Sequence, residues 1–453
     1  MLRRKMIERL DAWKRTSRHK ALLLTGARQT GKTFIVREFA RNSYESFIEV
    51  NFIENKDAVS FLGSASDSRD LISRITFLTG QELKSGSTCI FLDEVQEEPD
   101  IVTMSKFLIE DGRFDLILSG SLLGVELRGI RSFPVGYLHI ERMYPLDFEE
   151  FCWSQAVPEE MLDTLRSCYL EKQPVELTLH ERFIKLFRLY VVLGGMPEAV
   201  QRYIDTAHDL NAVRLVASDI IEQYREDIAQ YAPNRALQIK TIFDNIPSEL
   251  VKVNKRFQMK SIKTGATYDR YDDDFAWLID AGVALPTYSA TEPKFPLIQT
   301  KVKERFKLYS SDVGLLISQY PRRITMDVIE GTRSVNFGSV YENAMAQELM
   351  AINPHLYYYT NNRKGEIDFL FETDEGTVVP IEVKSGKDYK LHTALNNLLE
   401  TPDYAIEHAY VFSEANISTG QRKGKPVYYL PLYLSFCLSL EKSNDFTGTW
   451  KFP

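Results

Sequence analysis

The sequence predicts an α/β protein in which a parallel sheet is followed by a helical middle block and then by a second α/β region. Two observations carry this prediction. Over residues 1–150, short continuous apolar runs alternate with helical periodicity, which is typical of a parallel sheet covered by helices. Over residues 331–453, strands and helices alternate again after a long helical stretch.

Length and composition set the outer limits. The chain has 453 residues, of which 44% are hydrophobic and 26% charged, as in ordinary globular proteins, and this length suggests about two to four domains. The net charge of -8 argues against a protein that coats DNA with its whole surface, although local basic patches remain allowed. The expected domains are 1–150, 151–235 (helical), 236–330 (winged-helix-like) and 331–453.

The four cysteines are scattered along the chain, which excludes a CxxC zinc site and indicates a reducing compartment. The charged N-terminus lacks the apolar core of a signal peptide, and no apolar run approaches the length of a membrane span. We therefore expect a cytoplasmic protein with no membrane contact.

The stretch GARQTGKT follows the apolar run Ala21–Leu24 and has the pattern of a phosphate-binding loop. Two glycines allow the tight turn that directs successive backbone N–H groups at one point. Lys32 is expected to reach the β- and γ-phosphates of ATP, and the Thr33 hydroxyl to bind Mg²⁺. The predicted nucleotide-binding residues of this loop are Gly26, Arg28, Gln29, Thr30, Gly31, Lys32 and Thr33.

The residues after the loop, 34–40, suit a helix whose positive N-terminus also faces the phosphates. The competing interpretation is a glycine turn in an ordinary strand-to-helix connection.

Two further predicted strands end in polar residues. Cys89–Leu92 reads as a buried parallel strand and is followed by Asp93, suited to hold a Mg²⁺ water, and Glu94, suited to act as a base. The strand 114–118 leads into Ser119 and Ser121. We expect Ser121 to sense the γ-phosphate, with Ser119 as the equal alternative and a helix N-cap as the simpler one.

Helical periodicity dominates residues 159–230, with a break at Gly194-Gly195. Beyond it, three helices and two strands resemble the order of a winged-helix module. The expected helices are 236–245, 248–253 and 271–281, and the expected strands are 283–288 and 306–309.

This module contains a basic group that could meet a DNA backbone. The alternative is a solvated face, because three aspartates at 272–274 nearly cancel its charge. The basic group consists of Lys252, Lys255, Arg256, Lys260 and Lys263 around Phe257.

A second chemical constellation lies near the C-terminus. A predicted helix, 338–351, carries Glu342, and three strands follow at 356–360, 366–372 and 378–385. If the turn at 373–377 is centred on Glu375, Asp368 lies directly opposite Glu382, and strand parity puts Lys384 on the same face.

Opposed carboxylates repel one another unless a cation lies between them, and Mg²⁺ or Mn²⁺ would relieve that repulsion. Lys384 could then orient the attacking water. Two alternatives stay open: a charged hairpin face that simply meets water, and a nuclease-like fold that only binds.

With these motifs in view, the chain resembles a family of AAA-type P-loop ATPases that carry a C-terminal restriction-endonuclease-like domain of the PD-(D/E)xK type. The resemblance implies that Glu342, Asp368 and Glu382 hold a metal and that Lys384 completes the site. The motifs that carry it are GARQTGKT, FLDEVQ, ILSGSLLG, YPLDFEEF, LGGMPEAV, FKLYSSDVGLL, VYENAMAQEL, GEIDFLF and PIEVKSGK.

The sequence departs from the family pattern at two places. Ile367 stands where the motif name has proline, and Gly136 is followed by Tyr137 where relatives often have arginine. An arginine finger is therefore not assigned, and Arg128 and Arg131 are nearby candidates without motif support.

The resulting prediction is a Mg²⁺-dependent ATPase, assembled as a homo-oligomer, whose nucleotide state controls a metal-dependent nuclease domain acting on DNA. The alternatives are a nucleotide-switched scaffold with an inert nuclease-like domain and an ATPase that remodels a protein partner.

Overall fold

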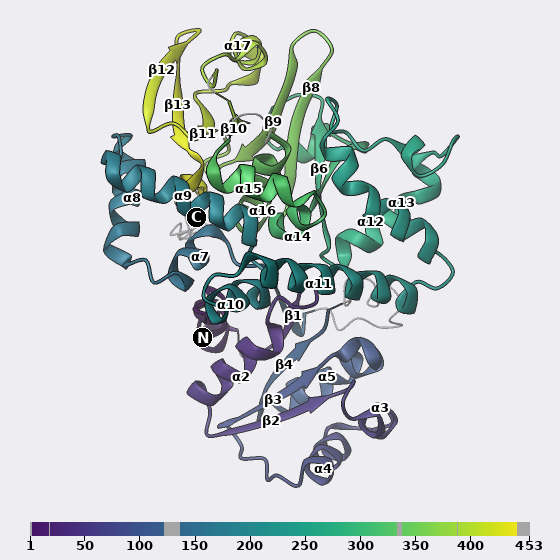
Figure 1. The fold of residues 1–453 in the computed structure, drawn as a ribbon. Helices are drawn as coiled ribbons and strands as arrows, with labels where there is room; N and C mark the ends of the chain where they lie inside the picture. Colours follow the sequence, from purple (N-terminus) through teal and green to yellow (C-terminus); the bar gives the residue numbers. More distant parts are fainter. Residues whose placement is uncertain (1, 18, 122–135, 333–337, 387, 442–453) are drawn as a thin grey trace, which may run out of the picture. The chain divides into compact units, whose positions relative to one another are not determined.

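The computed structural model describes residues 2–17, 19–121, 136–332, 338–386 and 388–441 (Figure 1). The chain divides into two compact units. The first contains residues 1–145 and 273–283, and the second contains residues 146–272 and 284–453. Among the described helices, none combines the length and the apolar character needed to cross a membrane.

The first unit is built on a five-stranded sheet in the order β2-β3-β4-β1-β5, and all its neighbouring strands are parallel. This confirms the predicted parallel sheet. Strand β4 lies between β1 and β3, so the carboxyl ends of these three strands meet at one edge. The strands are β1 (Ala21–Thr25), β2 (Ser46–Asn51), β3 (Thr88–Asp93), β4 (Asp115–Ser119) and β5 (Leu138–Arg142).

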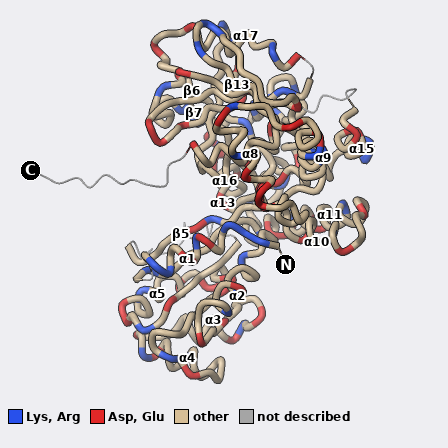
Figure 2. The backbone as a smooth tube through the Cα atoms, turned by 90° about the vertical axis from the view of Figure 1, so that its left-hand side faces the viewer, with Lys and Arg blue, Asp and Glu red and all other residues tan. Residues whose placement is uncertain are grey.

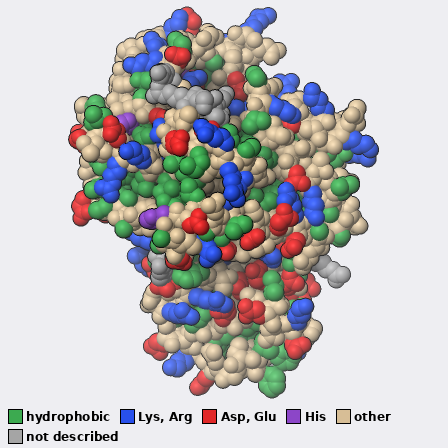
Figure 3. All heavy atoms as spheres, in the orientation of Figure 1, with side chains coloured by type: hydrophobic (Ala, Val, Ile, Leu, Met, Phe, Trp, Pro, Cys, Tyr) green, Lys and Arg blue, Asp and Glu red, His purple; other side chains and the backbone are tan. Residues whose placement is uncertain are grey.

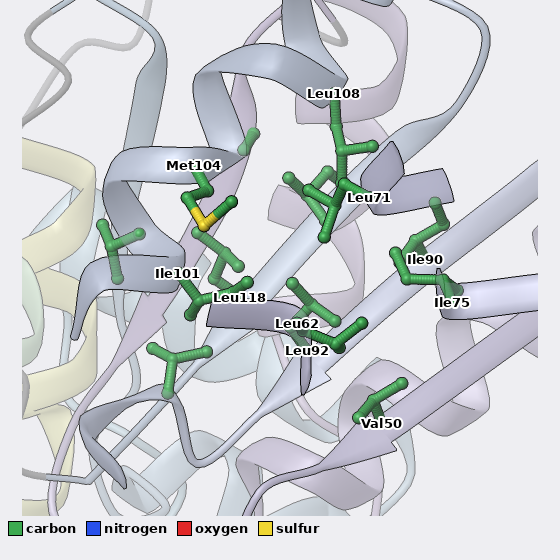
Figure 4. Close-up of a cluster of buried hydrophobic side chains, with 14 of the residues drawn as sticks. Val50, Leu62, Leu71, Ile75, Ile90, Leu92, Ile101, Met104, Leu108 and Leu118 are labelled. Atoms are coloured by element: carbon green, nitrogen blue, oxygen red, sulfur yellow. The ribbon is translucent and has the colours of Figure 1, made fainter. Parts of the chain in front are cut away.

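Helices cover both faces of this sheet, which explains why its central strands β1, β3 and β4 are buried along almost their whole length. Alternate residues of β1 enter two cores: Ala21 and Leu23 pack with α3, α4 and α5, while Leu22 and Leu24 pack with α1 and α2. Figure 4 shows the first of these cores. The helices are α1 (Met6–Thr16), α2 (Lys32–Ser43), α3 (Lys56–Gly63), α4 (Ser68–Thr79), η1 (Val95–Glu97) and α5 (Asp100–Asp111).

The second unit contains a mixed eight-stranded sheet in the order β12-β13-β11-β10-β9-β8-β6-β7. The pairs β6–β8, β10–β11 and β11–β13 are parallel, and the other neighbours are antiparallel. The strands are β6 (Ala284–Ala290), β7 (Lys301–Ser310), β8 (Leu356–Asn361), β9 (Gly365–Glu372), β10 (Val378–Val383), β11 (Ala409–Ser413), β12 (Ser418–Arg422) and β13 (Lys425–Pro431).

Helices precede and interrupt these strands. The predicted break at Gly194-Gly195 is confirmed, since α9 ends at Leu193 and α10 begins at Pro197. The helices are α7 (Phe148–Ser154), α8 (Glu159–Glu171), α9 (Leu177–Leu193), α10 (Pro197–Asp205), α11 (Leu210–Tyr231), α12 (Ala236–Leu250), η3 (Met259–Ser261), η4 (Leu297–Thr300), α14 (Val313–Ser318), α15 (Arg322–Glu330), α16 (Gly338–Ile352), α17 (Thr393–Leu399), η5 (Pro402–Tyr404) and η6 (Leu432–Glu441). Helix α13 (Tyr268–Asp280) begins in the second unit, and its residues from 273 on belong to the first.

The middle region departs from prediction in one helix. The expected helices 236–245 and 248–253 are a single helix, α12, with Pro247 inside it. Pro247 has no N–H for the carbonyl four residues earlier, so the helix lacks one bond there, but Ile246 and Leu250 are buried beside it. Tertiary packing therefore carries the helix past the proline.

The predicted winged-helix hairpin is also corrected. Strands β6 and β7 pair antiparallel as expected, but β6 also pairs in parallel with β8. The hairpin is thus the edge of the eight-stranded sheet. The backbone groups on one side of β6 bond to β7, and those on the other side bond to β8 instead of to water. The domain boundary expected at residue 330 falls between β7 and β8, which belong to the same sheet.

Several sequence motifs meet in a buried polar junction of the second unit, which we call the Asp312 junction (Leu146, Gly195, Asp312 and Gln347). The Asp312 carboxylate accepts a hydrogen bond from the Gly195 N–H at 2.6 Å, and the Leu146 N–H donates to the Gly195 carbonyl at 2.7 Å. Gln347 Nε2 donates to the Leu146 carbonyl at 3.3 Å. A Cβ atom on Gly195 would lie 2.0 Å from the Leu146 oxygen, so only glycine fits there.

Candidate functional site

The phosphate-binding loop joins β1 to α2 in the first unit. The loop turns through left-handed φ angles of 138° at Gly26, 67° at Gln29 and 92° at Gly31, and α2 begins at Lys32. A Cβ atom on Gly26 would lie 2.2 Å from the Met143 carbonyl oxygen, which explains the glycine at the end of the strand. The strand, loop and helix predicted from the sequence are therefore all present.

Side-chain hydrogen bonds to backbone carbonyls fix the conformation of the loop. Lys32 is buried, and its Nζ donates to the Gly26 carbonyl at 3.0 Å and to the Ala27 carbonyl at 2.9 Å. The Thr30 hydroxyl donates to Ala27 O at 2.9 Å, and Arg4 Nη1 donates to Thr30 O at 3.0 Å. The lysine is thus kept at the loop with its ammonium group next to backbone carbonyls.

Asp93, at the end of β3, is the centre of the polar cluster beside this loop. Its carboxylate accepts hydrogen bonds from the Thr33 hydroxyl at 2.8 Å, the Asn51 side-chain amide at 3.0 Å and the Ser119 hydroxyl. The backbone N–H of Glu94 donates to it at 3.1 Å. The structure therefore brings together Thr33 and Asp93, the two residues expected to act on Mg²⁺.

Burial acts on the charge of Asp93. It raises the pKa of this carboxyl, helped by the negative charges of Glu94 and Glu49, and outweighs the hydrogen bonds from Ser119 and Thr33 that act in the opposite direction. The side chain is held by uncharged donors in a buried place. Such a carboxylate favours a nearby cation, and oxygen ligands of this kind suit Mg²⁺.

Glu94 and the two serines lie at the carboxyl ends of β3 and β4, beside Asp93 in the sequence or in the sheet. Glu94 has a left-handed φ of 57°, and its Oε2 accepts from Gln96 Nε2 at 2.6 Å. Ser119, not Ser121, bonds to Asp93. Ser121 is buried, and its hydroxyl makes no hydrogen bond with the described residues, so its role stays a prediction.

Sequence reasoning missed three residues of this cluster: Asn51, Gln96 and Arg4. Asn51 could have been predicted in the same way as the serines, because it is a polar residue at the carboxyl end of a strand, β2. Arg4 carries no local signal, because its partners Thr30 and Tyr144 are distant in sequence. Arg128 and Arg131 lie outside the described residues.

The second constellation lies in the second unit. We call it the C-terminal cluster: the carboxylates Glu342, Glu366, Asp368 and Glu382 with the lysines Lys255, Lys307 and Lys384. Strands β9 and β10 pair with Phe369 opposite Ile381, and this register, continued by one residue, puts Asp368 opposite Glu382 as predicted. Gly376 has the expected left-handed φ of 80° in the connecting turn.

The side chains of this cluster are largely buried, so the hairpin does not simply turn a charged face to water. The side chain of Glu342 is 4% exposed, that of Glu382 8% and that of Asp368 16%. The Asp368 Oδ2 atom accepts from the Val383 N–H at 2.9 Å, which ties the carboxylate to the neighbouring strand.

Lysines face every carboxylate of the cluster. The fully buried Lys307 Nζ lies 2.7 Å from Glu366 Oε1, 3.8 Å from Asp368 Oδ1 and 3.9 Å from Glu342 Oε2. Lys255 forms an ion pair with Glu342, and Lys384 forms one with Glu382. Lys255, Lys307 and Glu366 were not predicted to be part of this site, because only tertiary structure brings them there.

The electrostatics of the two opposed carboxylates differ. Burial and the charge of Glu342 raise the pKa of Asp368 to about 7 against the opposing effect of Lys307 and Lys255. Burial also acts to raise the pKa of Glu382, but hydrogen bonding from His392 and the charge of Lys384 outweigh it, so this pKa is lowered. His392 Nδ1 lies 3.4 Å from Glu382 Oε2.

This arrangement does not fit a bound metal. The expected ligands already face ammonium groups, and the described part of the chain contains no group of three or more His, Cys, Asp or Glu disposed to hold a metal ion. The predicted Mg²⁺ or Mn²⁺ site at Glu342, Asp368 and Glu382 is therefore not supported in this conformation.

The basic group of residues 252–263 is partly engaged within the chain. Lys252 pairs with Glu249, and Lys255 pairs with Glu342. Lys and Arg as well as Asp and Glu are scattered along the tube in Figure 2, and on the face in Figure 3 the described basic and acidic side chains are interspersed. A basic surface for DNA is thus not evident on that face.

Three protein-family models match successive parts of the chain. Residues 18–152 match a family described as an AAA domain. Residues 184–323 match a domain of unknown function, DUF8612, and residues 337–433 match another, DUF4143. No curated protein matches the sequence.

Solved structures with similar folds are distant. A Walker-type ATPase of Pyrococcus abyssi is 13% identical with a TM-score of 0.42, over 70% of this chain and 95% of that chain. The RuvB Holliday junction branch migration motor of Thermotoga maritima is 13% identical with a TM-score of 0.28, over 68% and 92%. Drosophila ORC bound to DNA is 12% identical with a TM-score of 0.27, over 72% and 93%.

These structural likenesses are too weak to carry a functional argument. The sequence match and the loop geometry together support an ATPase domain of the AAA P-loop type in the first unit, whereas the families matched by the second unit bring no function with them.

Proposed function

We propose that this protein binds ATP with Mg²⁺ at the loop Gly26–Thr33 and hydrolyses it. The observation that carries the proposal is the 2.8 Å hydrogen bond between the Thr33 hydroxyl and Asp93, at the N-terminus of the helix that follows the loop. Two oxygen ligands are held together there beside the loop N–H groups that would face a triphosphate.

The residues of the loop would take separate tasks. Lys32, released from the carbonyls of Gly26 and Ala27, would reach the β- and γ-phosphates. Thr33 and Asp93 would hold Mg²⁺, which neutralises charge on the phosphate oxygens when it is bound. The loop N–H groups and the positive end of α2 would hold the remaining oxygens.

Glu94 would accept the proton of the attacking water. Its carboxylate is bonded to Gln96 in the described conformation, so this hydrogen bond would have to exchange for one to the water. Ser119 or Ser121, at the end of β4 between β1 and β3, would sense the γ-phosphate.

Calorimetric titration of ATP into Lys32→Ala tests the nucleotide site. We expect affinity about 100-fold weaker, because the variant loses charge-assisted contacts to two phosphates. Lys20→Ala, one residue before β1, is the matched control and should bind as the wild type does. Unchanged affinity in Lys32→Ala would reject the assignment of the loop.

For the second unit we propose a nuclease-like domain that acts on DNA. The convergence of Glu342, Asp368, Glu382 and Lys384 in one cluster supports it. A second candidate is an inert nuclease-like domain in a nucleotide-switched protein, and the ion pairs of Lys255 and Lys307 favour that candidate.

An assay for cleavage of plasmid and oligonucleotide DNA with Mg²⁺ or Mn²⁺, with and without ATP, distinguishes an active nuclease domain from an inert one. Cleavage that Lys384→Ala abolishes would support the nuclease. Absence of cleavage under every condition, with ATP hydrolysis intact, would support the inert domain.

A neighbouring subunit is proposed to complete the nucleotide site, because no motif assigns an arginine to the γ-phosphate. Light scattering with a non-hydrolysable ATP analogue should then show assembly. A strictly monomeric particle with full ATPase activity at every concentration would contradict this proposal.

A further inference from the structure

Four helices of the second unit border a cavity of about 330 Å³, which we call the Arg214 pocket. Helix α14 packs against α9, α11 and α15, and all four helices supply residues to the lining of the pocket (Figure 1). The lining contains no residue of the C-terminal cluster. The volume is near the lower end of the range for small-molecule sites, so the pocket suits a small ligand.

Much of the wall of the Arg214 pocket is apolar and fixed in place. A Cβ atom on Gly314, which lines the pocket, would lie 2.4 Å from the Leu193 carbonyl oxygen, so α9 and α14 are in close backbone contact there. The wall is therefore preformed, and it can take the apolar body of a ligand out of water. Its apolar side chains include Val192, Leu193, Val213, Ala217, Ile317 and Met326, of which all but Met326 are buried.

Two arginines also line the pocket, Arg214 on α11 and Arg322 on α15. Arg214 is partly buried, and its Nη2 donates to the Tyr320 carbonyl at 2.6 Å, which holds the side chain in place. Among the described residues, no carboxylate forms an ion pair with either arginine. Burial and the charge of Arg322 lower the pKa of Arg214, so an anion bound between the two guanidinium groups would relieve an electrostatic cost.

The N-termini of two helices border the same pocket and add to its positive potential. Helix α15 begins at Arg322, and its N-cap, Pro321, makes no side-chain hydrogen bond to the first turn. Helix α11 begins at Leu210 and is capped by Asp209, whose carboxylate accepts from the Asn211 N–H at 2.8 Å. Asp209 is the one carboxylate in the lining, so it offsets part of the positive charge.

The charges of the lining indicate the charge of the ligand. Arg214 and Arg322 carry two positive charges and Asp209 one negative charge, which leaves one positive formal charge when His208 is counted as neutral. That excess matches a monoanion better than a phosphate group, which is close to a dianion. A guanidinium group can bind both oxygens of a carboxylate at once. The arginines and the apolar wall together therefore favour a carboxylate attached to an apolar body.

We propose that the Arg214 pocket binds a small organic monocarboxylate. The carboxylate of the ligand pairs with Arg214 and Arg322, and its apolar body lies against the buried side chains of α9, α11 and α14. This inference does not depend on the proposed ATPase or nuclease-like function, because the pocket shares no residue with the phosphate-binding loop, the Asp93 cluster or the C-terminal cluster.

Saturation-transfer NMR titrations of the full chain with hexanoate and with phenylacetate test this site. These probes combine a carboxylate with an aliphatic or an aromatic body. The better of the two should bind at least tenfold more tightly than its neutral amide, hexanamide or phenylacetamide, because the amide cannot form charge-assisted hydrogen bonds with the arginines. Inorganic phosphate, which has charge but no apolar body, should bind at least tenfold more weakly than that probe.

Substitutions assign the binding to this pocket. Arg214→Met and Arg322→Met should each weaken binding of the better probe at least tenfold, since each removes one guanidinium group. Arg202→Met is the matched control, because Arg202 is an exposed arginine on α10 that does not line the pocket, and this variant should bind as the wild type does. Thermal melting establishes that each variant is folded. If Arg214→Met does not fold, the exposed Arg322 decides alone.

Several results would overturn the proposal. Absence of binding by both carboxylate probes, or equal binding of the better probe and its amide, would show that the pocket does not recognise a monocarboxylate. Phosphate binding as tight as that of the better probe would make the pocket a general anion site. Unchanged affinity in Arg322→Met, or an equal loss in Arg202→Met, would place the bound carboxylate elsewhere on the protein.

Discussion

Asp93 and the C-terminal cluster are both sites of buried carboxylates, yet the partners of these carboxylates differ in charge. The hydrogen bonds to Asp93 come from two hydroxyls, an amide and a backbone N–H. The carboxylates of the C-terminal cluster face the ammonium groups of three lysines.

The comparison shows that residue type alone does not determine whether a carboxylate can take a metal. Neutral donors orient a carboxylate and leave its charge for a cation, whereas an ammonium group both orients and neutralises it. The first arrangement suits a ligand site, and the second suits a structural ion cluster or a closed site. Four substitutions test which of these carboxylates belong to a ligand site and which are structural. They are given in order from the largest expected effect to the smallest.

Glu94→Gln should retain ATP binding and lower the turnover number by at least about 100-fold, because an amide holds a water but cannot accept its proton. Steady-state hydrolysis and nucleotide titration on the same preparation measure both. Hydrolysis at the wild-type rate would place the base elsewhere and weaken the assignment of the Asp93 edge as a reactive site.

Lys307→Met should lower the free energy of unfolding by about 3–5 kcal/mol, since it leaves the buried carboxylates of Glu342 and Asp368 without the cation that they share with the partly exposed Glu366. Lys303→Met, on the exposed part of the same strand, should cost less than about 1 kcal/mol. Urea unfolding of the two variants gives the difference. Equal stability of both would show that the cluster is not held together by this lysine.

Asp312 extends the comparison, because it is a buried carboxylate held by backbone N–H groups. Burial raises its pKa to about 6 from 3.8 despite these bonds. The folded state therefore binds more protons than the unfolded state between these values, so stability falls as pH rises from about 4 to about 6. Relative to Asp312→Asn, the wild type should lose about 3 kcal/mol over this range. A pH-independent difference would contradict the raised pKa.

Asp93→Asn should change the free energy of unfolding by no more than about 1 kcal/mol, because the loss of a buried charge offsets the loss of the hydrogen bonds to the oxygen that becomes an NH₂ group. ATP hydrolysis should nevertheless be lost. The contrast with Lys307→Met is measured by the same urea experiment. A large destabilisation by Asp93→Asn would make Asp93 a structural residue like those of the C-terminal cluster.

The parts of the two sites that sequence analysis predicted depend on short-range geometry. The loop, its flanking strand and helix, and the alignment of Asp368 with Glu382 each follow from spacing within one turn or one hairpin. The sequence alone could not predict that Lys255 and Lys307 join the cluster, because their neighbours depend on how β7 pairs in the sheet and how residues 251–258 pack beside it. A hairpin of strands 283–288 and 306–309 was predicted, but nothing in the sequence of these strands indicated that β8 would pair with β6.

The eight-stranded sheet of the second unit is open, so it has two edges that could recruit another chain. Exposed charged residues line the outer half of β7, at Lys301, Lys303, Glu304 and Arg305, and β12 is short and polar. Charged side chains on an edge strand oppose pairing with a foreign strand. The same strand that brings Lys307 into the interior thus also protects the protein from edge-to-edge aggregation.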